Sequence, residues 1–149
     1  MSARLPAVLL VALAAASPAH AELYYLIVGG LGGEPTYEEQ FAKDTEALAA
    51  VARRTTAQNR VIVLKGEGAT REAVVNGLES LRTRAKAADS VIVVLVGHGS
   101  YDGEAYKLNL PGPDIDGDEF AKLLAAVPAR SQLVVNTTSA SGAILEKWA

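Results

Sequence analysis

The sequence contains no cysteine, and only 5% of its 149 residues are aromatic. Without cysteine the chain has no disulfide bonds, no thiolate metal sites and no cysteine nucleophile. It also lacks an excess of positive charge, because 14 lysines and arginines stand against 17 aspartates and glutamates, for a net charge of −3. That balance argues against a nucleic-acid-binding surface. Apolar residues make up 50% of the chain, which is enough for the core of one ordinary domain.

The first 21 residues, MSARLPAVLLVALAAASPAHA, have the pattern of a Sec-type signal peptide. Arg4 supplies the positive start, residues 7–16 form an apolar run, and Ala19-His20-Ala21 is a small-x-small cleavage site. The run is too short to span a membrane, and no later stretch approaches the ~20 apolar residues that a spanning helix needs. We therefore expect cleavage after Ala21 and an exported mature protein, residues 22–149, that is periplasmic or secreted. The alternative is an N-terminus that anchors the chain to a membrane.

Short apolar runs alternate with longer segments of helical periodicity. The predicted strands are residues 23–30, 60–65, 90–96 and 132–135, and the predicted helices are residues 36–54, 70–88, 116–127 and the first turns of one at 143–148. Apolar strands separated by helices predict an α/β domain with a parallel sheet covered on both faces. If the chain reverses direction after the second strand, right-handed crossovers give the strand order 2-1-3-4.

Ligands of such sheets bind beyond the carboxyl ends of the strands. The unusual residues of this sequence are expected there, in the loops Gly29–Gly33, Gly97–Ser100 and Asn136–Gly142. One longer insert, Tyr101–Ile115, separates the third strand from its helix. Within it, residues 108–110 are predicted to form a small hairpin with residues 105–107.

Two motifs suggest ligands but fail on spacing. The glycines of Gly29–Gly33 resemble a dinucleotide-binding loop, yet Pro35 stands where the third glycine belongs, so a tightly turning loop beside a site is expected. The acidic segment Asp114–Glu119 suggests a calcium loop, but its glycine is at position four, and position twelve is Ala125. We expect instead that Asp116 caps the following helix and that Glu119 completes a capping box.

His98 is the only histidine after the predicted cleavage site, and it follows the third apolar strand between two glycines. An imidazole at this position can act as a general base near neutral pH. The loop Asn136–Gly142 follows the fourth strand and is rich in hydroxyl groups, which either cap the next helix or supply a nucleophile. Adjacent strands lie ~4.8 Å apart. The side chains of His98 and Ser139 can therefore meet.

This arrangement resembles the caspase–legumain clan of cysteine peptidases, most closely its legumain-like branch. The resemblance rests on an apolar strand ending in His98-Gly99 and a second ending in Ser139-Ala140-Ser141-Gly142. It implies a caspase-like three-layer sandwich that hydrolyses peptide bonds without a cofactor or metal. His98 would be the general base, and the Gly99 and Ser139 amides would bind the oxyanion. Ser139 stands where the clan has its cysteine, and Ser141-Gly142 matches the segment after the nucleophile.

The replacement of cysteine by serine leaves two functions open. A serine nucleophile needs a well-oriented base, and the sequence names no residue to orient His98, although Asp102 is close in the chain. The protein is expected to be either a peptidase with a His98-based dyad or an inactive pseudo-peptidase. A pseudo-peptidase would bind peptides or proteins through Gly99, Thr138, Ser139 and Ser141. A nucleotide- or phosphate-binding flavodoxin-like domain is a weaker third reading. Clan members continue with further strands, so we also expect the domain to extend beyond residue 149.

Overall fold

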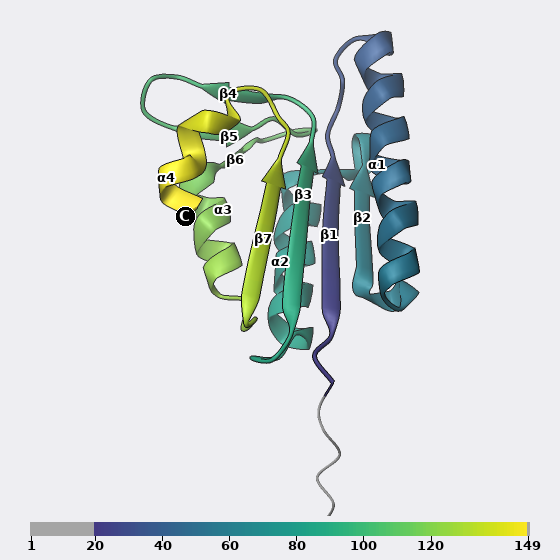
Figure 1. The fold of residues 1–149 in the computed structure, drawn as a ribbon. Helices are drawn as coiled ribbons and strands as arrows, with labels where there is room; N and C mark the ends of the chain where they lie inside the picture. The colour runs from purple at the N-terminus through teal and green to yellow at the C-terminus, as the bar shows by residue number, and fades with distance from the viewer. Residues whose placement is uncertain (1–19, 149) are drawn as a thin grey trace, which may run out of the picture.

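The computed structural model describes residues 20–148 and has a four-stranded sheet at its centre (Figure 1). The strands of this sheet are β1 (Leu23–Gly29), β2 (Val61–Lys65), β3 (Ser90–Val96) and β7 (Ser131–Asn136). All neighbouring strands are parallel, in the order β2-β1-β3-β7. The predicted parallel sheet and its 2-1-3-4 order are therefore confirmed, with β7 as the fourth strand. The predicted signal peptide lies almost entirely outside the described residues.

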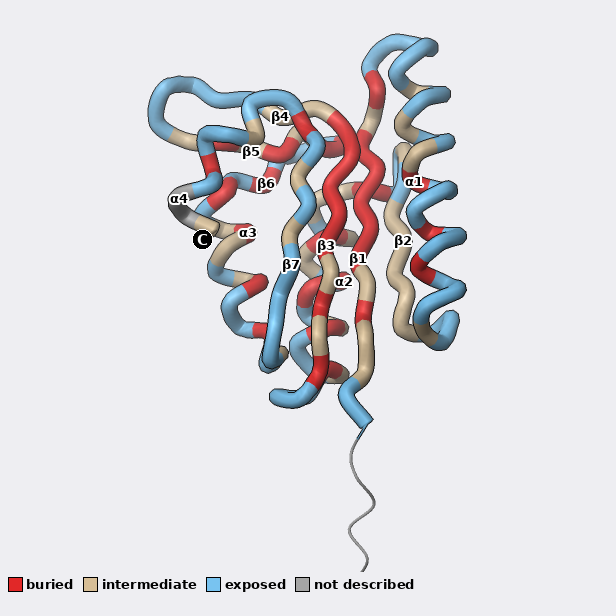
Figure 2. The backbone as a smooth tube through the Cα atoms, viewed as in Figure 1, coloured by how far each residue is buried: buried red, intermediate tan, exposed pale blue. Residues whose placement is uncertain are grey.

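Helices cover both faces of the sheet, as predicted (Figure 1). The helices are α1 (Pro35–Thr55), α2 (Arg71–Arg84), α3 (Gly117–Ala125) and α4 (Leu145–Trp148), with 3₁₀ turns η1 (Gln58–Arg60), η2 (Gly66–Gly68) and η3 (Ser141–Ile144). The larger core lies between the sheet and helices α2 and α3, and it includes Leu26, Leu78, Val93, Leu95 and Phe120. A smaller core under α1 contains Ile27, Ala49, Ala52, Val94 and Val96. The most continuously buried segments are β1 and β3 (Figure 2).

Local side-chain hydrogen bonds set where α2 and α3 begin. Thr70 caps α2 by accepting from the Ala73 amide at 3.1 Å. Asp116 caps α3 by accepting from the Glu119 amide at 2.7 Å, as predicted. The second half of the predicted capping box is wrong, because the Glu119 carboxylate pairs with Arg71 of α2. An ion pair to a neighbouring helix has replaced the local bond.

The helix predicted to run to residue 88 ends earlier, at Arg84. The cause is Asp89, a buried carboxylate that accepts from the amides of Lys86 and Glu22, each at 2.8 Å. These bonds fold residues 86–89 into a turn and fix the start of β1 beside β3. The helical periodicity could not show the bond to Glu22, because it joins segments far apart in the chain.

The insert after β3 forms a second, three-stranded antiparallel sheet of β4 (Gly99–Tyr101), β5 (Tyr106–Leu108) and β6 (Ile115–Asp116). The predicted hairpin within residues 105–110 is therefore wrong, because β5 pairs with β4 on one side and β6 on the other. Asp102 closes the β4–β5 turn by accepting from the amides of Glu104 and Ala105 at 3.0 and 2.9 Å. These hydrogen bonds lower the pKa of the Asp102 carboxyl to about 2.

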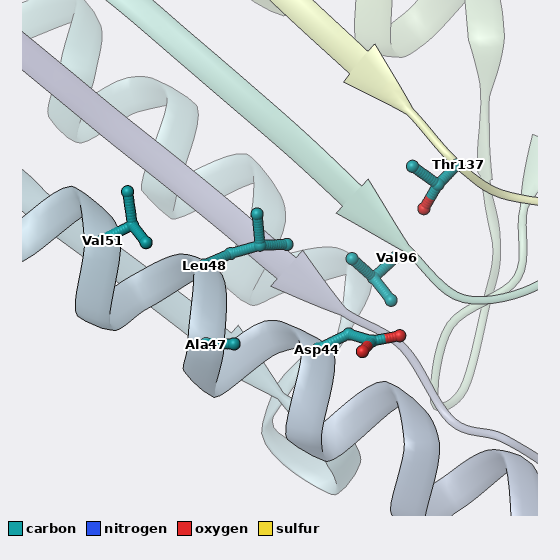
Figure 3. A pocket seen from close by; sticks show the side chains of 6 residues that line it. All are labelled: Asp44, Ala47, Leu48, Val51, Val96 and Thr137. Atoms are coloured by element: carbon teal, nitrogen blue, oxygen red, sulfur yellow. The ribbon is translucent and has the colours of Figure 1, made fainter.

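One part of the expected burial is missing, because β7 is an edge strand with an open face. Its side chains Leu133 and Val135 are 54% and 39% exposed on the α1 side of the sheet. An apolar groove of about 460 Å³ lies between α1 and the ends of β3 and β7 (Figure 3). Its lining residues are Asp44, Ala47, Leu48, Val51, Val96 and Thr137. In the described part of the chain, no helix is long and apolar enough to cross a bilayer.

Candidate active site at the strand ends

The loops after β3 and β7 touch at the carboxyl edge of the sheet, where the sequence placed the site. β3 and β7 pair from Ser90 and Ser131 up to Leu95 and Asn136. Just beyond, a Cβ added to Gly99 would lie 2.5 Å from the Ser139 carbonyl oxygen and 2.8 Å from Thr138 Oγ1. Only glycine allows this approach of the two loops. The Gly97–Ser100 and Asn136–Gly142 segments are therefore brought together.

The His98 ring is oriented by a backbone carbonyl. Its Nε2 lies 3.0 Å from the Gly32 oxygen, in the glycine loop after β1. Because a carbonyl oxygen can only accept, Nε2 carries the proton of the neutral ring, and Nδ1 keeps its lone pair. Tyr37 and Phe41 of α1 meet the ring edge to face, with centroids 5.3 and 5.1 Å away. The ring is thus fixed by contacts from β1's loop and from α1.

Gly32 is itself packed against the start of α1. It is buried, and a Cβ at this position would overlap the backbone of Tyr37 and Glu38. Its amide donates to Glu38 Oε2 at 2.7 Å. The glycine loop thus positions an acceptor for His98, and no nucleotide-binding role is needed to explain the glycines.

The register of the second sheet leaves the Gly99 amide available. Gly99 faces Leu108 across β4 and β5, and the Asn109 amide donates to the His98 carbonyl at 3.1 Å. In an antiparallel ladder this makes Gly99 and Leu108 a non-hydrogen-bonded pair. The Gly99 N–H therefore points away from β5, toward the outer edge of the β4-β5-β6 sheet. An amide in this position can donate to a ligand oxygen.

A closed ring of three hydrogen bonds fixes the loop that carries Ser139. Asn136 Nδ2 donates to the Tyr106 hydroxyl at 3.2 Å, and Thr138 Oγ1 donates to Asn136 Oδ1 at 2.8 Å. The Tyr106 hydroxyl then donates to Thr138 Oγ1 at 2.5 Å, which closes the ring. Thr138 is only 5% exposed. Its hydroxyl therefore positions the loop, and a contact of Thr138 with a bound peptide stays a prediction.

Ser139 follows this ring as an exposed residue, and Ala140 after it adopts a left-handed conformation with φ 56°. A left-handed alanine is strained, and such strain is concentrated at functional loops. Ser141 and Gly142 begin the turn η3. Within residues 20–148 no hydrogen bond joins the His98 ring to the Ser139 hydroxyl. Bonds of this kind often form only when substrate is bound.

Asp102 does not orient His98, because its carboxylate faces the β4–β5 turn and the Lys107 ammonium at 3.2 Å. Sequence reasoning missed the residue that does, Gly32, although the glycine run marked its loop. It also missed Tyr106, for which the sequence held no signal. Across the described residues there is no cluster of three or more histidine, aspartate or glutamate side chains arranged to bind a metal ion.

Comparisons with known proteins offer no further guide. No protein-family model, no curated protein and no solved structure matches this chain.

Proposed function

We propose that this protein is an exported peptidase with a caspase/legumain-like fold, in which His98 is the general base and Ser139 the nucleophile. The observation that carries the proposal is the hydrogen bond from His98 Nε2 to the Gly32 carbonyl. It supplies the orientation that a serine nucleophile demands of its base, and it leaves Nδ1 free to take a proton. The strand order, with His98-Gly99 after the third strand and Ser139 after the fourth, supports the caspase-like assignment.

The reaction would proceed through an acyl-enzyme. Ser139 Oγ attacks the carbonyl carbon of the peptide bond while its proton passes to His98 Nδ1. The negative charge that develops on the carbonyl oxygen is met by the Gly99 amide, which has no partner in the β4–β5 ladder. The protonated imidazole then gives its proton to the leaving amine, and the carbon–nitrogen bond breaks. Water, deprotonated by His98, releases the acyl group and restores the Ser139 hydroxyl.

Labelling tests this assignment. In wild-type protein, an activated acyl probe should modify Ser139, as mapped by mass spectrometry. In Ser139→Cys, a thiolate forms beside the imidazole near neutral pH, so thiol-directed peptidyl probes should react strongly. Adding His98→Ala to Ser139→Cys should remove most of that gain. Equal labelling rates for the two variants would show that no dyad exists.

The second candidate is a binding module that retains the cleft and has lost catalysis. It is favoured by the absence of a hydrogen bond between His98 and Ser139 in the described residues. Gly99, Ser139 and Ser141 would then contact an extended peptide. This reading predicts that no acyl probe labels Ser139, while peptide binding survives Ser139→Ala and is lost when Gly99→Ala separates the two loops.

A further inference from the structure

We propose that Glu38 is a positioning residue that, through Gly32, sets which nitrogen of His98 carries the proton. The inference rests on the proposed role of His98 as base, because only then does the tautomer matter for chemistry. Glu38 touches neither His98 nor Ser139 by hydrogen bond in the described structure. Its effect is transmitted by the backbone of one residue.

Two hydrogen bonds link Glu38 to His98 through Gly32. Glu38 Oε2 accepts from the Gly32 amide at 2.7 Å, and the Gly32 carbonyl accepts from His98 Nε2 at 3.0 Å. The first bond ends on a carboxylate, and charge-assisted bonds are roughly twice as strong as neutral ones. Both bonds are partly shielded from solvent. The Gly32 carbonyl belongs to the next peptide plane, two dihedral angles away, so anchoring the Gly32 amide restrains where that carbonyl points.

The loop needs this restraint because of its composition. Four of the five residues in Gly29–Gly33 are glycine, and glycine loses more conformational freedom on ordering than any other residue. Gly33 has φ +76°, so the chain turns sharply just after the carbonyl in question. The hydrogen bond from the loop to the Glu38 side chain of α1 offsets the entropy cost of ordering the loop.

The same turns of α1 complete the arrangement. Tyr37 and Phe41 each meet the imidazole edge to face, while Glu38 lies between them in sequence and binds the loop. When the Glu38 bond is lost, the ring keeps its aromatic contacts but the Gly32 carbonyl is free to move. Either nitrogen can then carry the proton, and a ring protonated on Nδ1 cannot act as base through that atom.

The test reads the tautomer directly. Nitrogen-15 shifts of the ring are measured at a pH where imidazole is neutral, in full-length protein carrying His20→Gln, so that His98 is the only imidazole. We expect Nε2–H as the main form. Glu38→Ala should raise the Nδ1–H population about fivefold, the effect of losing one hydrogen bond. Glu38→Gln retains an acceptor oxygen without the charge, so it should change the ratio clearly less than Glu38→Ala does.

The matched control is Glu39→Ala, which removes the neighbouring carboxylate of α1, whose partner is the exposed Lys43. It should leave the tautomer ratio unchanged. An unchanged ratio in Glu38→Ala would overturn the proposal. So would an equal change in Glu38→Gln, since charge rather than the hydrogen bond would then be responsible.

This readout needs no catalysis, so it separates the two proposals. If the tautomer responds as expected while acyl probes leave Ser139 unmodified, the peptidase assignment fails and the positioning role of Glu38 stands. If acyl probes modify Ser139 in wild type and Glu38→Ala leaves the tautomer ratio unchanged, the positioning role of Glu38 fails and the peptidase assignment stands. In the Ser139→Cys background, Glu38→Ala should also lower the labelling rate about fivefold, and Glu38→Gln should lower it less.

Discussion

Removing the Thr138 hydroxyl should destabilise the protein far more than the loss of one surface hydroxyl would. Thr138→Val keeps the shape of the side chain, so the main change is chemical. The Tyr106 hydroxyl loses its acceptor, and Asn136 Oδ1 loses one of the two bonds that it accepts from Thr138. A buried polar group left without a partner costs about 1–3 kcal/mol. We expect the free energy of unfolding to fall by about 2 kcal/mol, or roughly 6 °C in Tm for a domain of this size.

Urea denaturation followed by tryptophan fluorescence measures this loss. Trp148 is the only tryptophan, and its ring packs near Tyr106 and Phe120, so it reports on the same region. The matched control is Thr137→Val, one residue away, whose exposed hydroxyl donates to the Leu95 carbonyl. It should lose about 1 kcal/mol or less.

A double-mutant cycle with Tyr106→Phe tests the ring itself. Because the two hydroxyls share a bond, the double variant should be more stable than the sum of the single losses predicts, by about 1 kcal/mol. Strictly additive losses, or equal effects of Thr138→Val and Thr137→Val, would refute the closed ring of hydrogen bonds.

Three further predictions follow from other residues. Ala140→Gly should raise the free energy of unfolding by about 1 kcal/mol, because glycine adopts φ 56° without strain; a decrease on urea denaturation would contradict this. The Asp102 carboxyl should titrate near 2 by carbon-13 NMR, since its pKa is lowered to about 2 by the turn amides. The stabilisation it gives the β4–β5 turn is then present above about pH 4 and lost as the pH falls toward 2, and a midpoint near 4 would argue against these bonds. Leu133→Lys, on the exposed face of β7, should change the free energy of unfolding by less than about 0.5 kcal/mol and reduce self-association in light scattering; a large loss of stability would mean that Leu133 is covered in solution.

The central sheet was predictable because its signal is local. The runs 23–30 and 90–96 are apolar throughout, and only a strand buried on both faces needs such a run. The same kind of signal overstated the burial of the fourth strand, because Leu133 and Val135 are apolar and yet 54% and 39% exposed. A sequence pattern shows that a side chain is apolar, but it does not show whether an edge strand has a neighbour in the sheet.

The candidate site was only half predictable. His98, Gly99 and Ser139 could be placed because loops after adjacent parallel strands must meet. The group that orients His98 could not be predicted, because every residue has a backbone carbonyl. Only the folded loop places the carbonyl of Gly32 beside the ring. Glu119 is also beyond local prediction, because its ion pair with Arg71 in place of the capping bond depends on how α2 and α3 pack.

Helix α1 buries few large side chains against the sheet, and this affects how long the His98 ring stays ordered. The buried residues of this 21-residue helix are Thr45, Ala49 and Ala52, whereas α2 buries valine and leucine side chains. Little apolar area therefore opposes transient undocking of α1, and its amides should exchange with deuterated solvent sooner than those of α2. Each undocking would also release Tyr37 and Phe41 from the His98 ring. The lifetime of an ordered imidazole is then set by how often α1 undocks, and not by β3, the strand that His98 follows.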